Sequence, residues 1–208
     1  MNNGRFISIE GGEGAGKSTS VAFIQDFLQS RGIELVSTRE PGGTQLAEQL
    51  RQLLLNHHDE KIDPYTELLM MFAARRQHVT QVIQPALAAG KWVLCDRFTD
   101  ASYAYQGYGR ELPLEFIDNL AKWVHGDTNP DMTCLLDLDI EVGMGRARQR
   151  SELDRIESEA MSFFEAVRQG YLSRAKAEPQ RFRVIDASQD IPGVEQQLQQ
   201  ALEGLLAE

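Results

Sequence analysis

The chain has 208 residues and a net charge of −10, with 42% hydrophobic and 25% charged residues. This length predicts one domain over residues 1–208, and no apolar run approaches the ~20 residues that a membrane-spanning helix needs. The acidic balance argues against long nucleic acids as partners, because they are bound through a basic surface, but it leaves local binding of small phosphates open.

The two cysteines, Cys95 and Cys134, both lie in apolar runs. Two such residues predict buried, reduced thiols rather than a disulfide framework. The first residues lack the layout of a signal peptide. We therefore expect a cytoplasmic protein with no membrane and no nucleic-acid partner.

Predicted strands and helices alternate along the chain. Residues 5–10 alternate in hydrophobicity and end at a glycine cluster, which predicts a strand; a helix over 17–31 follows and stops at Gly32. Further strands are predicted at 34–38, 92–95, 133–138 and 182–186, and helices at 44–55, 64–89 (kinked at Pro85), 114–124, 141–149, 153–177 and 192–206. Residues 97–113, rich in tyrosine and glycine, are expected to be irregular and to line the site.

This order predicts an α/β fold in three layers, a five-stranded parallel sheet with helices on both faces. In such sheets ligands bind beyond the carboxyl ends of the strands. Polar residues follow each predicted strand at that edge, among them Glu10, Asp96 and Asp186.

Residues 11–18 read GGEGAGKS and match the phosphate-loop pattern G-x-x-x-x-G-K-[ST] between a predicted strand and a predicted helix. The glycines let the backbone aim its N–H groups at phosphates, Lys17 reaches the β- and γ-phosphates, and Ser18 places its hydroxyl on Mg²⁺. The pattern therefore predicts a P-loop NTPase fold that binds ATP with Mg²⁺. The residues expected to bind ATP are Gly11, Gly12, Glu13, Gly14, Ala15, Gly16, Lys17, Ser18, Thr19 and Arg146.

The rest of the chain favours a phosphotransferase among P-loop proteins. The base-reading Asn-Lys-x-Asp stretch of GTPase switches is missing from the sequence, and the second half is rich in arginine. Arg97, at a strand end, is suited to fork onto the phosphate of a second substrate. Asp96, one residue earlier, is suited to hold a magnesium-bound water.

Four segments together resemble the bacterial thymidylate kinase family. They are the P-loop, TREPGGT at 38–44, Asp96-Arg97-Phe98 and AYQG at 104–107, and the resemblance runs from Phe6 to about Asp186. It implies an ATP-dependent kinase that converts dTMP to dTDP with Mg²⁺ in dTTP biosynthesis, and a homodimer. It also supports the outer-shell magnesium role of Asp96.

The resemblance assigns residues to the acceptor dTMP. It places Glu40 in the acceptor region, makes Arg51 a second ligand of the acceptor phosphate, and aims Glu13 at the 3′-hydroxyl of the deoxyribose. It makes Ser102 and Gln106, four residues apart, contacts to the polar edge of thymine. The dTMP set is Glu13, Glu40, Arg51, Phe72, Arg75, Arg97, Ser102 and Gln106.

The resemblance implies that the thymine base lies between an aromatic ring and apolar groups, with an arginine that hydrogen-bonds its carbonyl edge. Phe72 precedes Arg75 by three residues, whereas the family pattern has a spacing of four, which would put Met71 at the stacking position. We favour Arg75 as the base reader with Phe72 in the pocket, and leave Met71 open.

A short arginine-rich lid is predicted at about 143–156. Arg146, Arg148, Arg150 and Arg155 fall within ten residues. The P-loop carries no arginine, and in the family variety of this kind lid arginines stabilise the transferring phosphoryl group. Arg150 is the first candidate and Arg155 the second, so the predicted catalytic set is Lys17, Arg97, Arg150 and Arg155.

Two other functions remain open at this point. One is another small-molecule P-loop kinase, acting on a different nucleoside monophosphate or on a nucleoside. The other is a nucleotide-sensing module without turnover. The arginines expected near the acceptor disfavour a neutral substrate.

Overall fold

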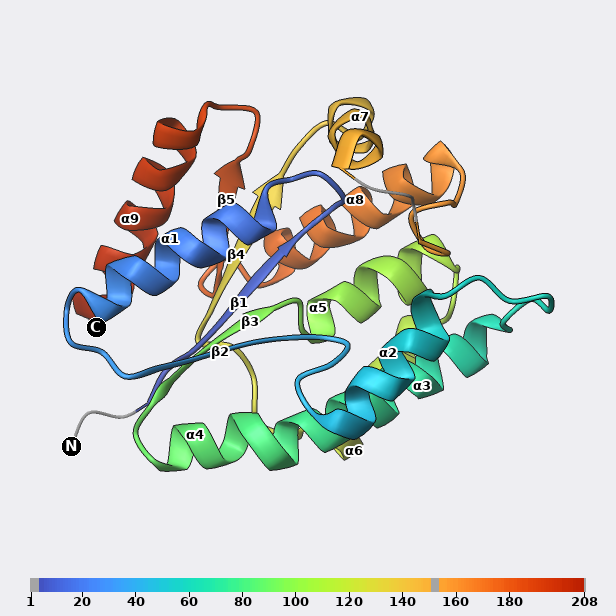
Figure 1. Ribbon diagram of the computed structural model, residues 1–208, viewed down its shortest axis with the longest axis horizontal. Helices are drawn as coiled ribbons and strands as arrows, with labels where there is room; N and C mark the ends of the chain where they lie inside the picture. The colour runs from blue at the N-terminus through green and yellow to red at the C-terminus, as the bar shows by residue number, and fades with distance from the viewer. Residues whose placement is uncertain (1–3, 151–153, 208) are drawn as a thin grey trace.

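The computed structural model describes residues 4–150 and 154–207, and the side chain of Arg150 also lies outside the described part. Its centre is a five-stranded, all-parallel sheet in the order β2-β3-β1-β4-β5 (Figure 1). This confirms the predicted fold class. The strands are β1 (Phe6–Gly11), β2 (Leu35–Arg39), β3 (Trp92–Asp96), β4 (Met132–Asp137) and β5 (Phe182–Asp186).

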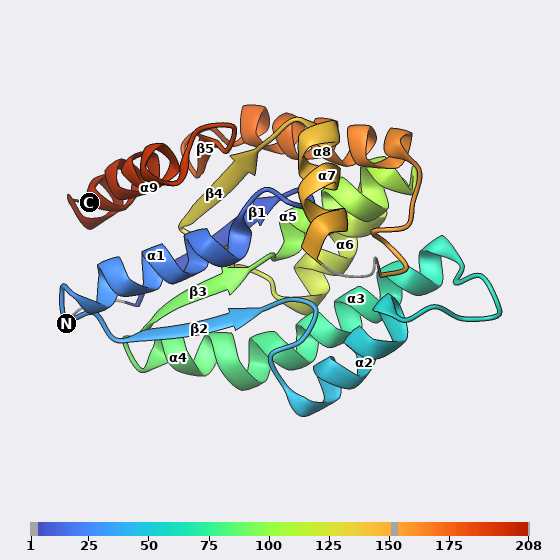
Figure 2. The same cartoon turned by 45° about the horizontal axis from the view of Figure 1, so that its top comes forward.

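Helices cover both faces of the sheet (Figure 2). One layer packs α1 and α9 against the sheet through residues such as Ile24, Leu28 and Leu202. The other face packs against η1, α4 and α8. The helices are α1 (Lys17–Gln29), α2 (Gln45–Leu55), α3 (Pro64–His78), α4 (Gln84–Ala88), α5 (Thr99–Ser102), α6 (Leu114–Val124), α7 (Ile140–Arg150), α8 (Met161–Ala177) and α9 (Ile191–Ala207), with π-helical segments η1 (Val79–Ile83) and η2 (Tyr103–Gly109).

Burial follows the position of each strand. Every residue of β1 is buried, because β1 is the central strand and has a neighbour on each side and helices above and below. The edge strands β2 and β5 are partly exposed. The carboxyl ends of β1 and β3 lie side by side, with Ile9 paired in register with Asp96, so the P-loop and Asp96-Arg97 emerge together.

The ends of two helices follow local chemistry. The Thr44 side chain accepts a hydrogen bond from Ala47 N (3.2 Å) at the start of α2, as the sequence predicts. Asp63 caps α3, and Pro64 takes the first helical position.

Two predicted elements are wrong in their bounds or type. Residues 97–113 are largely helical rather than irregular, since α5 and η2 bury Tyr103 and Tyr105 against neighbouring elements. The helix expected over 153–177 begins only at Met161, after turns held by the Asp154 side chain. The stretch 64–89 is helical as predicted, with the π-helical segment η1 just before Pro85, where the chain has no amide N–H to continue the ladder.

Cys95 and Cys134 are buried free thiols, as predicted. Among the described residues, no helix has both the length and the apolar character needed to cross a bilayer.

Candidate active site

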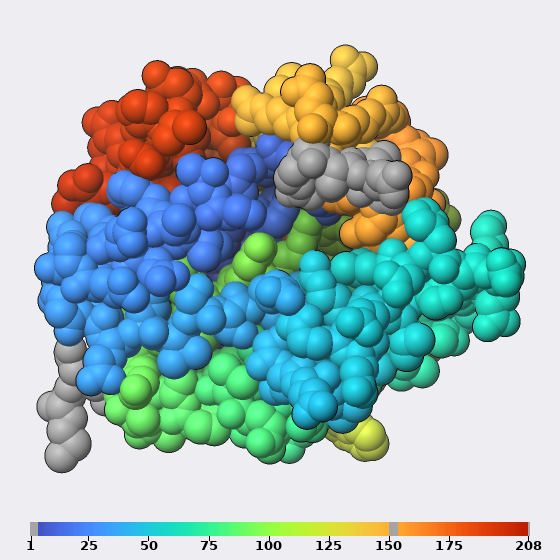
Figure 3. Space-filling model, viewed as in Figure 1, coloured from blue at the N-terminus to red at the C-terminus, as the bar shows by residue number. Residues whose placement is uncertain are grey.

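A cavity of about 710 Å³ opens at the carboxyl ends of β1, β2 and β3. In the space-filling view the surface is hollowed between the blue P-loop segment and the cyan α2 segment (Figure 3). Most of the predicted site residues meet there: Glu13, Gly14, Ala15, Gly16, Lys17, Ser18, Thr19, Glu40, Arg51, Arg75, Asp96, Arg97, Ser102, Gln106 and Arg146. Of the predicted residues whose side chains the structure describes, four do not line it: Gly11, Gly12, Phe72 and Arg155.

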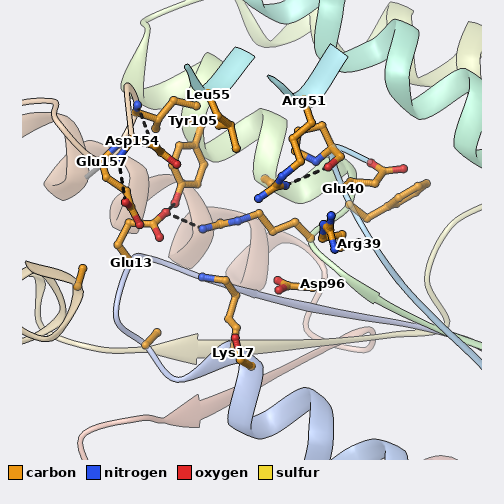
Figure 4. Close-up of a pocket in the computed structure, with 18 of the residues that line it drawn as sticks. Glu13, Lys17, Arg39, Glu40, Arg51, Leu55, Asp96, Tyr105, Asp154 and Glu157 are labelled. Atoms are coloured by element: carbon orange, nitrogen blue, oxygen red, sulfur yellow. Dashed lines mark hydrogen bonds and ion pairs between the residues drawn. The ribbon is translucent and has the colours of Figure 1, made fainter. Parts of the chain in front are cut away.

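The P-loop wraps the start of α1. Lys17 Nζ donates to the carbonyls of Gly11 (3.1 Å) and Gly12 (2.9 Å), so these two glycines contribute through the shape of the loop. Burial lowers the pKa of Lys17, and the nearby Arg97 lowers it further. Its side chain extends from α1 towards the cavity (Figure 4).

The P-loop and α7 touch through their backbones. Gly14 has a positive φ of 69°, and a Cβ at this position would overlap the carbonyl of Gly143 in α7. A Cβ on Gly143 would in turn overlap the carbonyl of Glu13. Because both positions lack side chains, α7 sits directly on the loop, and Arg146 lies over the same cavity.

Three arginines place positive charge in the cavity opposite the P-loop. They are Arg39, Arg51 and Arg97. Arg51 donates to the carbonyl of Pro41 (3.0 Å), and its pKa is lowered by burial and by the charges of Arg39 and Arg97. Three positive side chains that line one cavity form a site with a preference for anions.

Arg97 is held in an unusual backbone conformation, with φ at 70°. Its amide donates to Ile9 O (2.9 Å), and its guanidinium donates to Glu13 Oε1 (2.7 Å) and to Tyr171 Oη (3.1 Å). A left-handed conformation at a non-glycine residue persists only where the surroundings fix it. The guanidinium is thereby aimed across the mouth of the P-loop.

Glu13 does not act as a lone carboxylate in the phosphate loop. It accepts hydrogen bonds from Arg97 (2.7 Å) and from the hydroxyl of Tyr105 (2.8 Å) (Figure 4). Burial raises the pKa of Tyr105 well above its usual range, so its hydroxyl stays a donor. The negative charge is neutralised where it would repel a phosphate, and the carboxylate still borders the cavity.

A second cluster surrounds Arg75 at the deep end of the cavity. The Arg75 guanidinium donates to Glu40 Oε2 (2.6 Å), Ser102 Oγ (3.0 Å) and the carbonyl of Phe98 (3.2 Å). Glu40 also pairs with His78 Nδ1 (2.9 Å). Burial raises the pKa of Glu40, but the Arg75 charge and the His78 hydrogen bond outweigh it and hold that pKa below its usual range. Glu40 thus orients Arg75.

Phe72 does not lie where the base was expected. It is 2% exposed and packs in a core cluster with Leu68 and Ile117, whereas Met71 lines the cavity. The Arg75 guanidinium carbon lies 4.6 Å from the Phe72 ring centre, so Phe72 supports the arginine from behind. The expectation of Phe72 in the pocket is corrected to Met71, which is four residues before Arg75 and shares its helix face.

The predicted lid arginines lie in different places. Arg146 is exposed on α7 and lines the cavity. Arg155 does not line the cavity. Its guanidinium donates to Leu54 O (2.7 Å) and Glu67 Oε2 (2.7 Å), so the structure does not place it at the reacting phosphates. The side chain of Arg150, the first candidate, lies outside the described residues, as do residues 151–153.

Ser18 and Asp96 provide oxygen atoms of the kind that Mg²⁺ prefers. Both line the cavity, and Asp96 Oδ1 is buried with no hydrogen-bond partner in the described part of the chain. Within that part, no group of three or more His, Cys, Asp or Glu side chains could hold a metal alone. Mg²⁺ fits this arrangement, since it is commonly bound by one or two protein groups, phosphate oxygens and waters.

Sequence reasoning missed four residues that the structure brings to the site. Arg39, Tyr105 and Glu157 line the cavity, and Tyr171 bridges Arg97 to the buried Glu10 (2.8 Å). Tyr105 lies in the AYQG segment at 104–107, next to Gln106, so the sequence could have indicated it. Tyr171 comes from α8, and no sequence spacing relates it to Arg97.

Comparison with known proteins gives a consistent result. The family model described as thymidylate kinase matches residues 9–198. Thymidylate kinases from Teredinibacter turnerae and from Pseudomonas putida are 57% and 53% identical to this chain, which covers 99% and 97% of their lengths; the alignments each span 98% of this chain. The crystal structure of thymidylate kinase from Ehrlichia chaffeensis is similar with a TM-score of 0.78 and 35% identity, over 96% of this chain and 99% of that one.

Proposed function

Because the chain belongs to the thymidylate kinase family, we propose that its cavity transfers the γ-phosphoryl group of ATP to dTMP, giving ADP and dTDP. The observation that carries this proposal is one cavity with two ends. A P-loop lines one end, and the other end holds a buried arginine cluster. Phosphoryl transfer needs two anionic substrates aligned in one such space.

The acceptor phosphate is assigned to Arg97 and Arg51, with Arg39 beside them. These three side chains line the cavity between the P-loop and the Arg75 cluster, where an acceptor phosphate faces the γ-phosphate. Their mutual charge favours a monophosphate over a neutral nucleoside. The charge therefore argues against a nucleoside kinase, and the complete P-loop with its lysine argues for turnover.

The base of dTMP is assigned to the end lined by Arg75, Ser102, Gln106 and Met71. Arg75 offers N–H donors to a ring carbonyl, and Met71 offers an apolar surface. Glu13 and Tyr105 border the space between this end and the P-loop, which suits hydrogen bonding to the 3′-hydroxyl by Glu13.

Mg²⁺, when bound with ATP, neutralises charge on the phosphate oxygens during transfer. Ser18 would supply a hydroxyl ligand, and Asp96 would hold a magnesium-bound water through its unpartnered oxygen. Lys17 and Arg97 position the phosphates, and a lid arginine supplies further positive charge. For this last role Arg146 has support as a cavity-lining residue, and Arg150 remains a candidate from the sequence.

A panel of monophosphates tests the proposal. ADP release should be fastest with dTMP and much slower with dCMP, UMP, CMP and AMP, and it should require Mg²⁺. Equal or faster release with CMP or AMP would show that the acceptor assignment is wrong. Omission of Mg²⁺ without loss of rate would remove the metal assignment.

The chain is also proposed to form a homodimer in the cytoplasm. On α3 and α6, five large apolar side chains are exposed: Tyr65, Leu69, Leu114, Phe116 and Trp123, the last at 88%. The Tyr65 and Phe116 rings pack edge to face with centres 5.7 Å apart, so the helices form one continuous apolar face. Analytical ultracentrifugation should give about twice the chain mass, and Trp123→Ser should shift the protein towards the monomer.

A further inference from the structure

Glu67 is a buried carboxylate that touches the site without lining it. It lies on α3, is 1% exposed, and is not among the residues that border the cavity. Its Oε1 atom accepts a hydrogen bond from Gln106 Nε2 (2.9 Å), and Gln106 does line the cavity. Among the described residues that line the cavity, Gln106 is the one to which Glu67 is hydrogen-bonded.

Glu67 is held as an ionised group by two arginines. Arg110 donates through Nε to Oε1 (3.3 Å) and through Nη2 to Oε2 (3.1 Å), and Arg155 donates through Nη2 to Oε2 (2.7 Å). Burial raises the pKa of Glu67, but Arg110 and the hydrogen bonds outweigh it and hold that pKa below its usual range. An ionised carboxylate accepts hydrogen bonds and cannot donate one.

This chemistry fixes the orientation of the Gln106 amide. The oxygen and nitrogen of an amide have almost the same shape, so the hydrogen-bond network decides which of them points where. Because Glu67 can only accept, the NH₂ group of Gln106 must face it. Gln106 Oε1 then points the other way, and no described group donates to it. The Oε1 atom is not fully enclosed by protein, and Gln106 lines the cavity, so Oε1 faces the cavity.

The same end of the pocket presents donors from Arg75, which is bonded to Ser102, four residues before Gln106. Arg75 has five N–H groups and uses three of them, on Glu40, Ser102 and the Phe98 carbonyl. A donor from Arg75 beside an acceptor from Gln106 complements a ring carbonyl beside a ring N–H. Thymine and uracil carry that pair at O4 and N3–H, whereas cytosine has an amino donor and an N3 acceptor in the same places.

We propose that Glu67 is a specificity-determining positioning residue, which selects an imide base by forcing Gln106 to present its carbonyl oxygen. This inference rests on the proposed function, since it takes the base of dTMP to bind at Gln106. It adds a residue outside the cavity to the reading of the base.

The test is Glu67→Gln, assayed with dTMP, dUMP and dCMP. An amide at position 67 has its own NH₂ group and lets Gln106 turn its nitrogen to the base. The kcat/KM values for dTMP and dUMP should then fall together by about tenfold, while that for dCMP stays unchanged or rises. The ratio of kcat/KM for dTMP to that for dUMP should stay within about twofold of the wild-type ratio, because both bases share the N3–H edge. An equal fall for all three substrates, or no change in the dTMP:dCMP ratio, would overturn the proposal.

Two further variants separate the possible failures. Arg110→Lys weakens the same cluster but leaves Glu67 ionised, so its dTMP:dCMP ratio should stay within about twofold of the wild type. Gln106→Leu removes the amide and should lower that ratio. If Gln106→Leu leaves the ratio unchanged, the proposed base site is wrong. If Gln106→Leu lowers the ratio and Glu67→Gln does not, only the role of Glu67 is wrong.

A crystal structure of the wild-type protein with dTMP covers the case in which Glu67→Gln does not fold. One terminal atom of the Gln106 amide should lie within about 3.2 Å of Glu67 and the other within about 3.2 Å of the base N3. A Gln106 side chain turned away from either partner would overturn the proposal.

Discussion

The donor and acceptor ends of the cavity hold their polar side chains in different ways. At the donor end, Lys17 Nζ bonds to two backbone carbonyls of its own loop, and Ser18 and Thr19 are exposed. At the acceptor end, Arg75 and Glu40 are each 4% exposed or less and are bonded to each other. The donor end is open to its ligand, whereas the acceptor end is assembled before the substrate arrives.

Because of this difference, loss of a side chain at the donor end should affect activity but not stability, whereas loss of one at the acceptor end should affect both. The donor-end Lys17 is bonded to neutral backbone carbonyls and not to a buried counter-charge, so its loss leaves no buried charge without a partner. An acceptor-end side chain satisfies another buried charge, and its loss leaves that charge without a partner. The residues that we propose to read the base therefore also stabilise the protein.

Lys17→Ala should show the largest effect on turnover and almost none on folding. We expect kcat to fall by roughly 10³-fold or more, since the lysine neutralises charge on the transferring phosphates. The melting temperature should stay within a few degrees of the wild type. Steady-state kinetics and thermal denaturation measure the two effects. Lys91→Ala, at an exposed ion pair with Glu34, is the matched control and should keep full activity.

Arg75→Lys should damage both properties. A lysine keeps the charge but cannot contact Glu40, Ser102 and the Phe98 carbonyl together. We expect the free energy of unfolding to drop by about 2–4 kcal/mol and kcat/KM for dTMP to fall about 100-fold. Urea denaturation and kinetics test this, with Arg76→Lys on the exposed side of the same helix as the control. Loss of activity at full stability would contradict the coupling of the two roles.

The neighbouring residues Met71 and Phe72 should differ in the same way, one affecting substrate binding and the other stability. Phe72→Ala should lower the free energy of unfolding by about 3–5 kcal/mol, because a fully buried ring is removed from a packed core. Met71→Ala should instead raise KM for dTMP by about tenfold and change stability by about 1 kcal/mol or less. A larger KM effect from Phe72→Ala in folded protein would return the stacking role to the aromatic ring.

Glu10, a buried carboxylate of β1, should make the stability of the protein depend on pH. It accepts from Phe98 N (2.7 Å) and from the Tyr171 hydroxyl, and burial, together with the charge of Asp100, raises its pKa to about 8. The folded state then binds a proton more tightly than the unfolded state, whose carboxyl has a pKa of about 4.5. The contribution to stability is complete below pH 4.5 and is lost as the pH rises towards 8.

Glu10→Gln should remove this pH dependence. Between pH 5 and pH 8.5 the wild type should lose roughly 2–4 kcal/mol of unfolding free energy relative to the variant. Urea denaturation at several pH values measures the slope for each protein. Parallel slopes for wild type and variant would show that Glu10 is ionised in the folded state throughout this range.

The sequence determined what depends on neighbours along the chain. Short apolar or alternating runs predict the five strands, because burial follows a local pattern, and the alternation of strands with helices predicts their parallel arrangement. The phosphate loop is equally local, since residues 11–18 are consecutive and lie between a strand and a helix. The chain order also brings Asp96 and Arg97 to the edge that holds the P-loop, as the structure confirms.

The tertiary structure decided what depends on contacts between distant segments. A helical spacing could not choose between Met71 and Phe72, because the packing of α6 and η2 determines which face of α3 is the core. The charge of Arg155 suggested a catalytic role, yet its guanidinium is held by Glu67, 88 residues earlier in the chain. Glu67 itself carried no signal, since it becomes a partner of Gln106 only when α3 meets η2. Local patterns fix the backbone of the site, and the pairing of buried charges fixes where its side chains point.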